Sequence, residues 1–166
     1  MPFMSGEDAL DTADGTAPFG GADLTGENLT GANLTGANLT DANLEEANLT
    51  GANLSGANFE DARLVGANLE GAKFYGVNLC NATLREAYLS GTKGIAAVYL
   101  PGMSLHENFL YAVAGESAMF KAECFWGNEA DARAKVLEER GESKSAKLYL
   151  SAIDLAIMAL EADGAK

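Results

Sequence analysis

The hydrophobic residues of the chain recur every five positions over a long central segment. From Ala22 to Gly91 the sequence divides into 14 consecutive five-residue units without an insertion, and every unit has Leu or Phe at its central position. Two positions earlier, 12 of the 14 units have Ala, the exceptions being Glu27 and Val77. Each unit therefore offers one large and one small apolar side chain to a common core.

The five-residue period excludes the two common regular structures. It matches neither the 3.6-residue repeat of an α-helix nor the two-residue repeat of a β-strand, so the chain must turn at every unit to keep these residues on one side. Gly ends nine of the units, and Asp, Glu or Asn ends the others, which are residues that tolerate turns. Four units would close a square coil of 20 residues. Coils joined by backbone hydrogen bonds would lie about 4.8 Å apart.

These units read roughly Ala-(Asp/Asn)-Leu-x-x and resemble those of the pentapeptide-repeat family over about 70 residues. The resemblance implies an all-β solenoid, a right-handed quadrilateral β-helix, with the Leu and Phe residues stacked in its core beside a ladder of Ala. Glu27 occupies an inward position, but it lies in the first coil, where an open end would leave its carboxylate hydrated. An unpaired carboxylate deeper in the core would cost several kcal/mol.

The repeats define four segments of the chain. Residues 1–16 are expected to be a flexible acidic N-terminal segment, and residues 17–94 the regular pentapeptide-repeat solenoid. Residues 95–127 are either degenerate repeats or a β-hairpin, and residues 128–166 form a helical C-terminal cap.

The segment 95–127 has two possible structures. A small residue followed by an apolar one partly persists in the five-residue phase, which favours further coils. We prefer a hairpin of two strands, 108–113 and 118–126, because aromatic and aliphatic residues concentrate there.

The cap is predicted to contain two helices. Asn128 is the predicted N-cap of a helix that has acidic residues in its first turn and ends before Gly141. A second helix is predicted over residues 145–162. These helices would close the end of the solenoid, whose last coil otherwise exposes strand edges and core Leu side chains.

The second predicted helix is apolar around more of its circumference than docking on one surface requires. It carries two adjacent apolar stripes, which are Leu148, Ala152, Leu155 and Ala159, and Tyr149, Ile153, Ala156 and Leu160. Leu150, Ile157 and Met158 lie outside both stripes and form the candidate surface for a symmetric homodimer. Dimers joined at the C-terminal end are also implied by the family resemblance.

The chain is strongly acidic. It has 24 Asp or Glu and 11 Lys or Arg residues, a formal net charge of -13, which argues against general binding to nucleic acid or acidic lipid. The first basic residue is Arg63, and 11 acidic residues precede it. Because residues 20 apart share one side of the coil, this excess falls on two adjacent sides. The candidate partner-binding acidic surface consists of Asp23, Asp41, Glu45, Glu46, Glu60, Asp61 and Glu86.

No catalytic, metal-binding or cofactor-binding residues are predicted. The single histidine, His106, has no neighbouring motif, and the two cysteines, Cys80 and Cys124, lie far apart without a ligand motif. The recurrent glycines give G-x-x-x-x-G, but no Lys-Ser/Thr follows, so the spacing reflects the repeat and not a phosphate loop. We therefore expect a protein that is not an enzyme and has no cofactor.

The sequence favours a non-enzymatic structural or protein-interaction module that presents an acidic surface to an unknown protein partner. The alternative is mimicry of DNA, in which an acidic rod enters a basic DNA-binding groove. The resemblance implies this through its quinolone-resistance members, which act on type II topoisomerases such as gyrase. Seven acids are sparse beside the charge of a duplex. The chain has neither a signal-peptide core nor a membrane span, so a cytoplasmic location is expected.

Overall fold

The computed structural model describes residues 19–99, 109–114, 118–122 and 125–162. The chain forms two compact units, residues 1–93 and residues 94–166. The predictions made for residues 1–16, His106 and Cys124 lie outside the described residues. No helix in the described part of the chain has both the length and the apolar content needed to cross a membrane.

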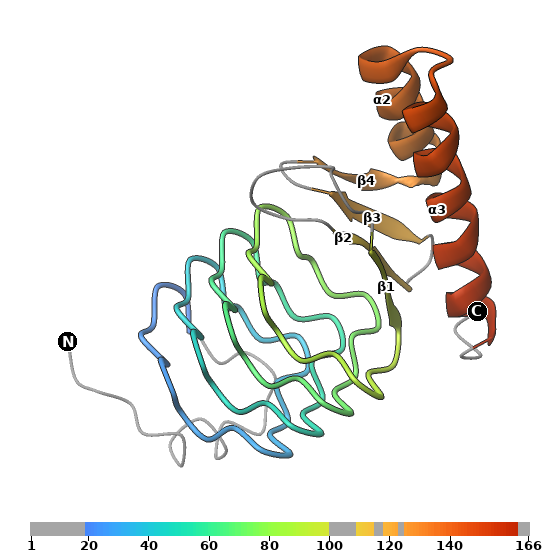
Figure 1. The fold of residues 1–166 in the computed structure, drawn as a ribbon. Coiled ribbons are helices and arrows are strands. Elements are labelled where there is room, and N and C mark those ends of the chain that lie inside the picture. Colours follow the sequence, from blue (N-terminus) through green and yellow to red (C-terminus); the bar gives the residue numbers. More distant parts are fainter. Residues whose placement is uncertain (1–18, 100–108, 115–117, 123–124, 163–166) are drawn as a thin grey trace. The chain divides into compact units, whose positions relative to one another are not determined.

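The first unit consists of coils joined by parallel pairing (Figure 1). Parallel bridges link residues 20 apart, beginning with Asp23 and Asn43 and ending with Lys73 and Lys93. In this ladder the Leu24 N–H donates to the Asn43 carbonyl at 2.7 Å, and the Asn43 N–H donates back to the Ala22 carbonyl at 2.9 Å. The same pattern repeats along the coils, so the backbone groups of each coil are satisfied by its neighbour.

A turn closes each five-residue unit, as one example shows. The N–H of Ala32 donates to the carbonyl of Leu29 at 3.0 Å, and Gly31 within this turn has a φ of 68°. The carboxamide oxygen of Asn28 accepts from both the N–H and the hydroxyl of Thr30, at 3.2 and 2.7 Å. Glycine at the corner and Asn before the central residue therefore each have a local conformational reason.

The core of the coils is made by the two apolar positions of each unit. Every central Leu or Phe from Phe19 to Leu84 is at most 2% exposed. The Ala residues between Ala32 and Ala82 are buried beside them, with Val77 in the one substituted place. Glu27 is half-buried in the first described coil.

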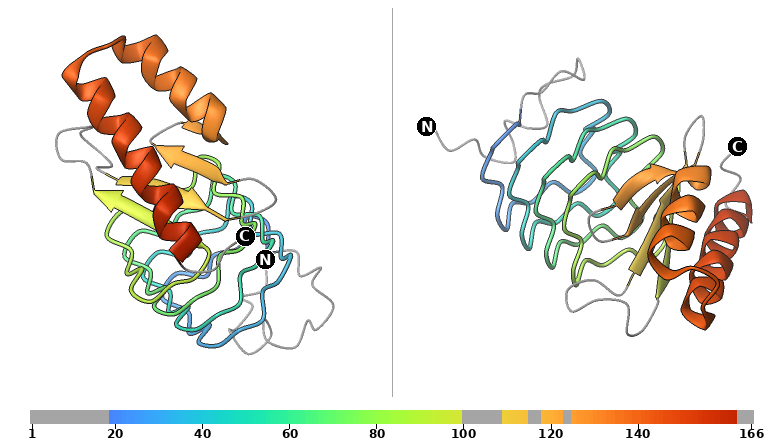
Figure 2. Two further views of the ribbon diagram at one scale, coloured as in Figure 1. Left: turned by 90° about the vertical axis from the view of Figure 1, so that its right-hand side faces the viewer. Right: turned by 90° about the horizontal axis from the view of Figure 1, so that it is seen from above.

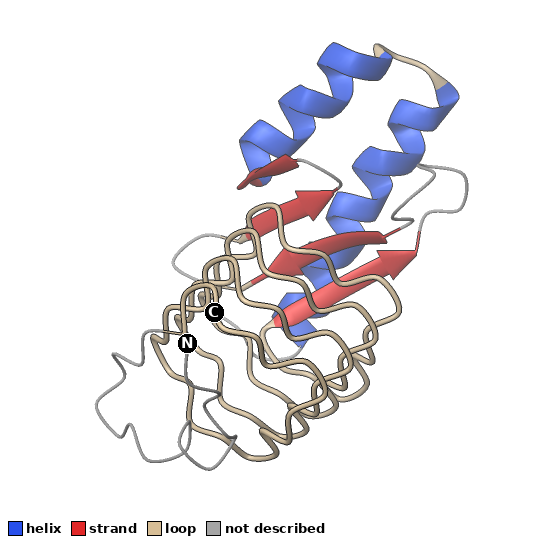
Figure 3. Ribbon diagram, turned by 90° about the vertical axis from the view of Figure 1, so that its left-hand side faces the viewer, coloured by secondary structure: helices blue, strands red, loops and turns tan. Residues whose placement is uncertain are grey.

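The second unit begins with a four-stranded antiparallel sheet in the order β1-β2-β3-β4. The strands are drawn in red in Figure 3. Its strands are β1 Ile95–Tyr99, β2 Phe109–Val113, β3 Met119–Ala122 and β4 Phe125–Asn128. Ile95 pairs with Val113, Val113 with Met119, and Met119 with Asn128.

The sheet departs from the interpretation of residues 95–127 as further coils and contains a hairpin of β2 and β3 at the place where one was predicted. The coils do not continue here, because β1 pairs antiparallel with β2. The next corner position of the five-residue repeat falls on Ala96, which lacks the conformational freedom of glycine. The chain therefore does not turn there but continues as β1. The expected second strand of the hairpin, 118–126, is divided into β3 and β4, which pair with each other. Its apolar run resembled one strand because both halves are rich in β-forming residues.

Two helices follow the sheet and lie on one of its faces (Figure 2). α2 spans Glu129–Arg140 and α3 spans Lys144–Ala162, in agreement with the predicted helices. The Asn128 side chain accepts from the Asp131 N–H at 3.0 Å, as expected of an N-cap. Gly141 ends α2 with a φ of 57° and donates its N–H to the Leu137 carbonyl.

Side chains join the two helices to each other. Arg140 donates to the Tyr149 hydroxyl at 2.8 Å, and its guanidinium lies 4.3 Å from the centroid of the Tyr149 ring. Arg133 of α2 pairs with Glu129 on its own helix and with Asp154 of α3. α3 packs against β1 and β2, and α2 packs against β3 and β4. Residues 95–127 and 128–162 therefore form one compact unit and not a connector followed by a separate cap.

Candidate functional site

The seven acidic residues predicted to form a surface all lie on the coils, in three kinds of position. Asp41, Glu46, Asp61 and Glu86 occupy corners, Glu45 and Glu60 directly precede corners, and Asp23 occupies the place usually taken by Asn. Asp23, Asp41, Glu46, Asp61 and Glu86 are exposed, and Glu45 and Glu60 are half-buried. The structure thus places the predicted residues outside the core.

Two corner columns carry most of this charge. In the first, Gly21, Asp41 and Asp61 follow one another at intervals of 20 residues, and each donates its N–H to the next coil. Asp41 and Asp61 have φ values of 58° and 59°. Adjacent coils are separated by about 4.8 Å, so these two carboxylates have a like-charged neighbour on the same corner.

The second corner column alternates between glycine and glutamate. It contains Gly26, Glu46, Gly66 and Glu86, and both glutamates have positive φ, 57° and 62°. Positive φ is a conformation that residues other than Gly adopt at a cost. A Cβ atom built on Gly21 or Gly26 meets nothing within 4 Å, so the cost at these corners is conformational and not steric crowding.

Ion pairs neutralise part of the predicted surface. Arg63 Nε donates to Glu45 Oε1 at 3.1 Å across neighbouring coils. Arg85 Nε lies 3.7 Å from Glu86 Oε1. None of Asp41, Glu46 and Asp61 forms an ion pair with a described residue. We call Asp41, Glu46, Glu60 and Asp61 the acidic corner surface.

Asp23 extends the acidic charge to the first described coil, where it also has a structural role. Its carboxylate accepts from the Thr25 hydroxyl at 2.6 Å and from the Thr25 N–H at 3.2 Å. These hydrogen bonds lower the pKa of Asp23, and the bond from the Thr25 hydroxyl has the larger effect. Asp23 therefore acts as a charged version of the turn-stabilising Asn found in other units.

The pairing of Glu45 with Arg63 was missed in the sequence. The two residues are 18 positions apart, one just after a central Leu and the other just before a central Leu on the next coil. The 20-residue period brings the two units together, and this offset of 18 would have indicated the pair.

The three residues of the predicted dimer surface differ in exposure. Leu150 and Ile157 are half-buried, and Met158 is 63% exposed. Leu148 and Leu155, predicted to lie in a docked stripe, are 51% and 54% exposed. The face of α3 that packs inward consists of Ala146, Tyr149, Ala152, Ile153, Ala156 and Leu160. The packed face is therefore narrower than the apolar arc of the sequence, and its centre lies on the second stripe.

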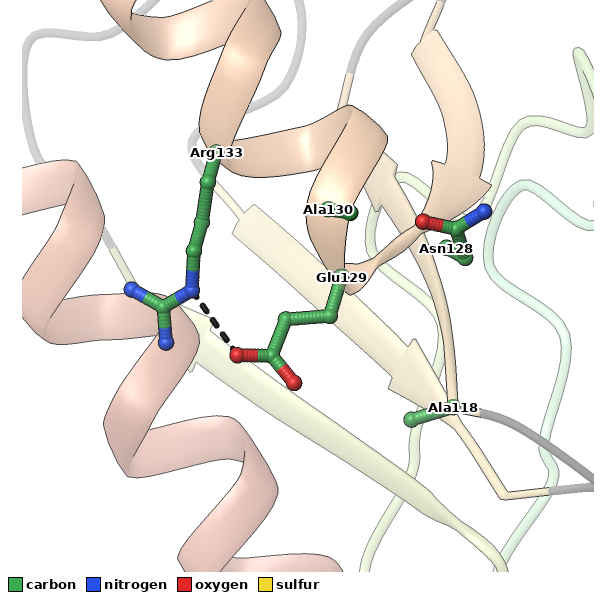
Figure 4. Close-up of a pocket in the computed structure, with 5 residues that line it drawn as sticks. All are labelled: Ala118, Asn128, Glu129, Ala130 and Arg133. Atoms are coloured by element: carbon green, nitrogen blue, oxygen red, sulfur yellow. Dashed lines mark hydrogen bonds and ion pairs between the residues drawn. The ribbon is translucent and has the colours of Figure 1, made fainter.

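An open hollow lies at the start of α2 (Figure 4). It is lined by Ala118, Asn128, Glu129, Ala130 and Arg133. Asn128 caps the helix, and the Glu129 carboxylate accepts from Arg133 Nε at 2.8 Å, so the polar groups of the hollow serve the fold. Among the described residues, no group of three or more His, Cys, Asp or Glu is arranged to hold a metal ion.

Comparison with known proteins identifies the repeat. The family model of pentapeptide repeats matches residues 17–51, 27–64 and 62–93, with eight copies. Residues 17–93 therefore belong to the pentapeptide-repeat family, whose known structures are right-handed β-helices. No curated protein sequence matches the chain.

Several solved structures are similar to this segment. HetL from Nostoc sp. strain PCC 7120, a pentapeptide repeat protein involved in heterocyst differentiation regulation, is 35% identical over 42% of this chain and 39% of its own, with a TM-score of 0.23. The pentapeptide repeat protein alr5209 from Nostoc PCC 7120 is 38% identical over 44% of this chain and 64% of its own, with a TM-score of 0.29. QnrB1, a plasmid-mediated fluoroquinolone resistance protein, is 24% identical over 43% of this chain and 40% of its own, with a TM-score of 0.29. The matches thus span between 39% and 64% of the lengths of these proteins.

The corner geometry predicts that replacing Glu46 by Gly stabilises the fold. Glu46 is exposed and has a φ of 57°, so Glu46→Gly should raise the free energy of unfolding by about 1 kcal/mol. Urea denaturation measures this difference. As a matched control, Gly51→Ala at a corner with a φ of 67° should lower the free energy of unfolding by a similar amount. A loss of stability in Glu46→Gly would contradict the assignment of strain to this corner.

Proposed function

We propose that the chain is a non-enzymatic protein-interaction module whose coils present the acidic corner surface to a basic segment of a protein partner. The observation that carries the proposal is the presence of Asp41, Glu46 and Asp61 at corners with positive φ. Nine of the 14 units have Gly at this position, where it carries no conformational penalty. Acidic residues at these corners cost stability and are exposed, which favours a role outside the fold.

We further propose that residues 17–94 form a right-handed quadrilateral β-helix. The parallel bridges at 20-residue intervals and the turn at each unit support this architecture. The family match over residues 17–93 supports its handedness. Such a coil is a rigid support, because every unit is held by backbone hydrogen bonds to the next coil. Rigid presentation of charged groups reduces the entropy lost on binding.

The proposed partner carries Lys and Arg residues. Like-charged carboxylates on adjacent coils, such as Asp41 and Asp61, create a local negative potential that attracts cationic side chains. Long-range attraction of this kind raises the rate of association and falls with ionic strength. We also propose a cytoplasmic location, on the basis of the two cysteines without a pairing motif.

Binding of a lysine-rich peptide tests the acidic corner surface. The triple variant Asp41→Asn/Glu46→Gln/Asp61→Asn should bind this peptide at least tenfold more weakly than the wild type in isothermal titration calorimetry at low salt, because three carboxylates are lost. The control Glu138→Gln/Glu142→Gln/Glu161→Gln removes the same charge from exposed positions on the helices and their connection. Equal weakening in both variants would show an effect of net charge and would reject the proposed surface.

A second candidate function is DNA mimicry directed at a type II topoisomerase. The acidic corner surface favours it, because carboxylates of one corner column follow one another on adjacent coils at about the strand spacing. A groove that binds duplex DNA is lined with Lys and Arg and would accept such a surface.

A DNA gyrase supercoiling assay, titrated with the chain in the presence and absence of a quinolone, tests this candidate. Mimicry predicts that the wild type inhibits supercoiling or protects gyrase from the quinolone at micromolar concentration. The variant Asp41→Asn/Glu46→Gln/Asp61→Asn should lack this effect. The absence of both effects would reject DNA mimicry and would leave the broader interaction proposal standing.

We also propose that α3 joins two copies of the chain. The proposed surface is centred on Leu148, Leu155 and Met158. These residues are 51%, 54% and 63% exposed and lie on one side of the helix. Leu150 and Ile157, half-buried, would lie at the edge of this surface.

Light scattering tests this assembly. The wild type should have the mass of a dimer, and Leu155→Glu/Met158→Glu should have the mass of a monomer, because two charges would face each other in an apolar contact. Ala130→Glu/Ala134→Glu at exposed positions on α2 serves as the control and should remain dimeric. A monomeric wild type would remove the proposal.

A further inference from the structure

Two lysines stand side by side on the coils, away from the acidic corner surface. Lys73 and Lys93 are linked by a parallel bridge, and the same column continues to Asn53 and Asn33. The Lys73 N–H donates to Ala52 and the Lys93 N–H to Ala72, both at 2.9 Å. These bonds fix both backbones, so the two side chains leave the coil in parallel, about 4.8 Å apart at their origins. Both lysines are exposed.

The ladder position of these lysines normally holds a side chain that stabilises the turn. Asn33 and Asn53 accept from the hydroxyls of Thr35 and Ser55 at 2.7 and 2.8 Å, and also from the N–H groups of the same residues. An ammonium group has no acceptor, so Lys73 forgoes this bond, whereas Lys93 is followed by β1 and not by a turn. Like charges directly opposite each other in a ladder add a second cost.

No ion pair among the described residues offsets these two costs. Arg63 also replaces Asn in the ladder, but it pairs with Glu45 on the adjacent coil. Neither Lys73 nor Lys93 has an ion pair with a described residue. The stretches on their side of the coils contain no Asp or Glu, namely residues 32–36, 52–56, 72–76 and 92–94. This is the side two units away from Asp23, Glu45 and Glu46.

We propose that Lys73 and Lys93 form a second interaction surface, which binds an acidic segment of a protein partner. Two parallel ammonium groups are suited to clamp a carboxylate between them, and Asn53 and Ser55 offer polar groups beside them. A long polyanion is disfavoured by the net charge of -13. A short acidic segment meets less repulsion, because the stretches that carry Lys73 and Lys93 contain no Asp or Glu, and Glu70 is the one acidic residue within five positions of either lysine.

The proposal makes the chain an adaptor with two surfaces of opposite charge. It does not depend on the acidic corner surface, because it rests on other residues and on a ligand of opposite sign. The probe for its test is a capped peptide that contains three Glu residues. Two-dimensional NMR follows the resonances of Lys73 and Lys93 during titration with this peptide.

The decisive variant is Lys73→Asn/Lys93→Asn, which restores the residue common in this ladder. It should melt roughly 4 °C higher than the wild type, because a turn-stabilising hydrogen bond is gained at position 73 and the repulsion between the two ammonium groups is lost. It should bind the peptide at least tenfold more weakly. The matched control, Lys144→Gln/Lys147→Gln on α3, loses the same charge at exposed positions and should bind like the wild type.

Three results would overturn the proposal. The first is a wild type whose Lys73 and Lys93 resonances show no saturable shift at millimolar peptide. The second is equal binding by the wild type and the Asn variant. The third is a response of these resonances to inorganic phosphate but not to the peptide, which would indicate a site for small anions. The variant Asp41→Asn/Glu46→Gln/Asp61→Asn should still bind the Glu peptide. A negative result for one proposed surface can therefore be distinguished from a negative result for the other.

Discussion

The turn at every fifth residue is the constraint on which the coiled unit depends. A positive φ at the corner redirects the chain, and only then can residues 20 apart meet in a parallel ladder. The ladder in turn places the central Leu or Phe and the preceding Ala inside, where they exclude water. Corner conformation, backbone pairing and core packing therefore support one another, which is a mark of a sequence that specifies one structure.

The same constraint explains why departures from the repeat carry information. Most side chains on the coils are repeated because the ladder needs them, so their chemistry reports on the fold. Asp41, Glu46 and Asp61 replace Gly at corners, and Lys73 and Lys93 occupy the ladder column of Asn33 and Asn53. Each replacement has an unfavourable conformational or electrostatic term. The two proposed binding surfaces rest on charged residues of this kind.

The second unit follows different rules. Beyond Gly94 the residues suited to corners no longer recur every five positions, and β-forming residues build antiparallel strands instead. Helix limits were predictable because caps are local: Asn128 accepts the Asp131 N–H and Gly141 adopts positive φ. The strand division was not, because the apolar run 118–126 contains no glycine or proline until Gly127, and its fold into β3 and β4 is set by pairing.

The five-residue period, the inward residues, the family resemblance and the helical ends were all predictable from the sequence, because each is encoded by neighbouring residues. Tertiary structure alone decided which charges remain available. Arg63 pairs with Glu45, which lies 18 positions earlier on the adjacent coil, while Asp41 and Asp61 stay exposed. It also decided which face of α3 packs, leaving Leu148 and Leu155 exposed. Ion pairing and burial depend on residues brought together by the fold, and a periodic sequence offers many equivalent candidates for each contact.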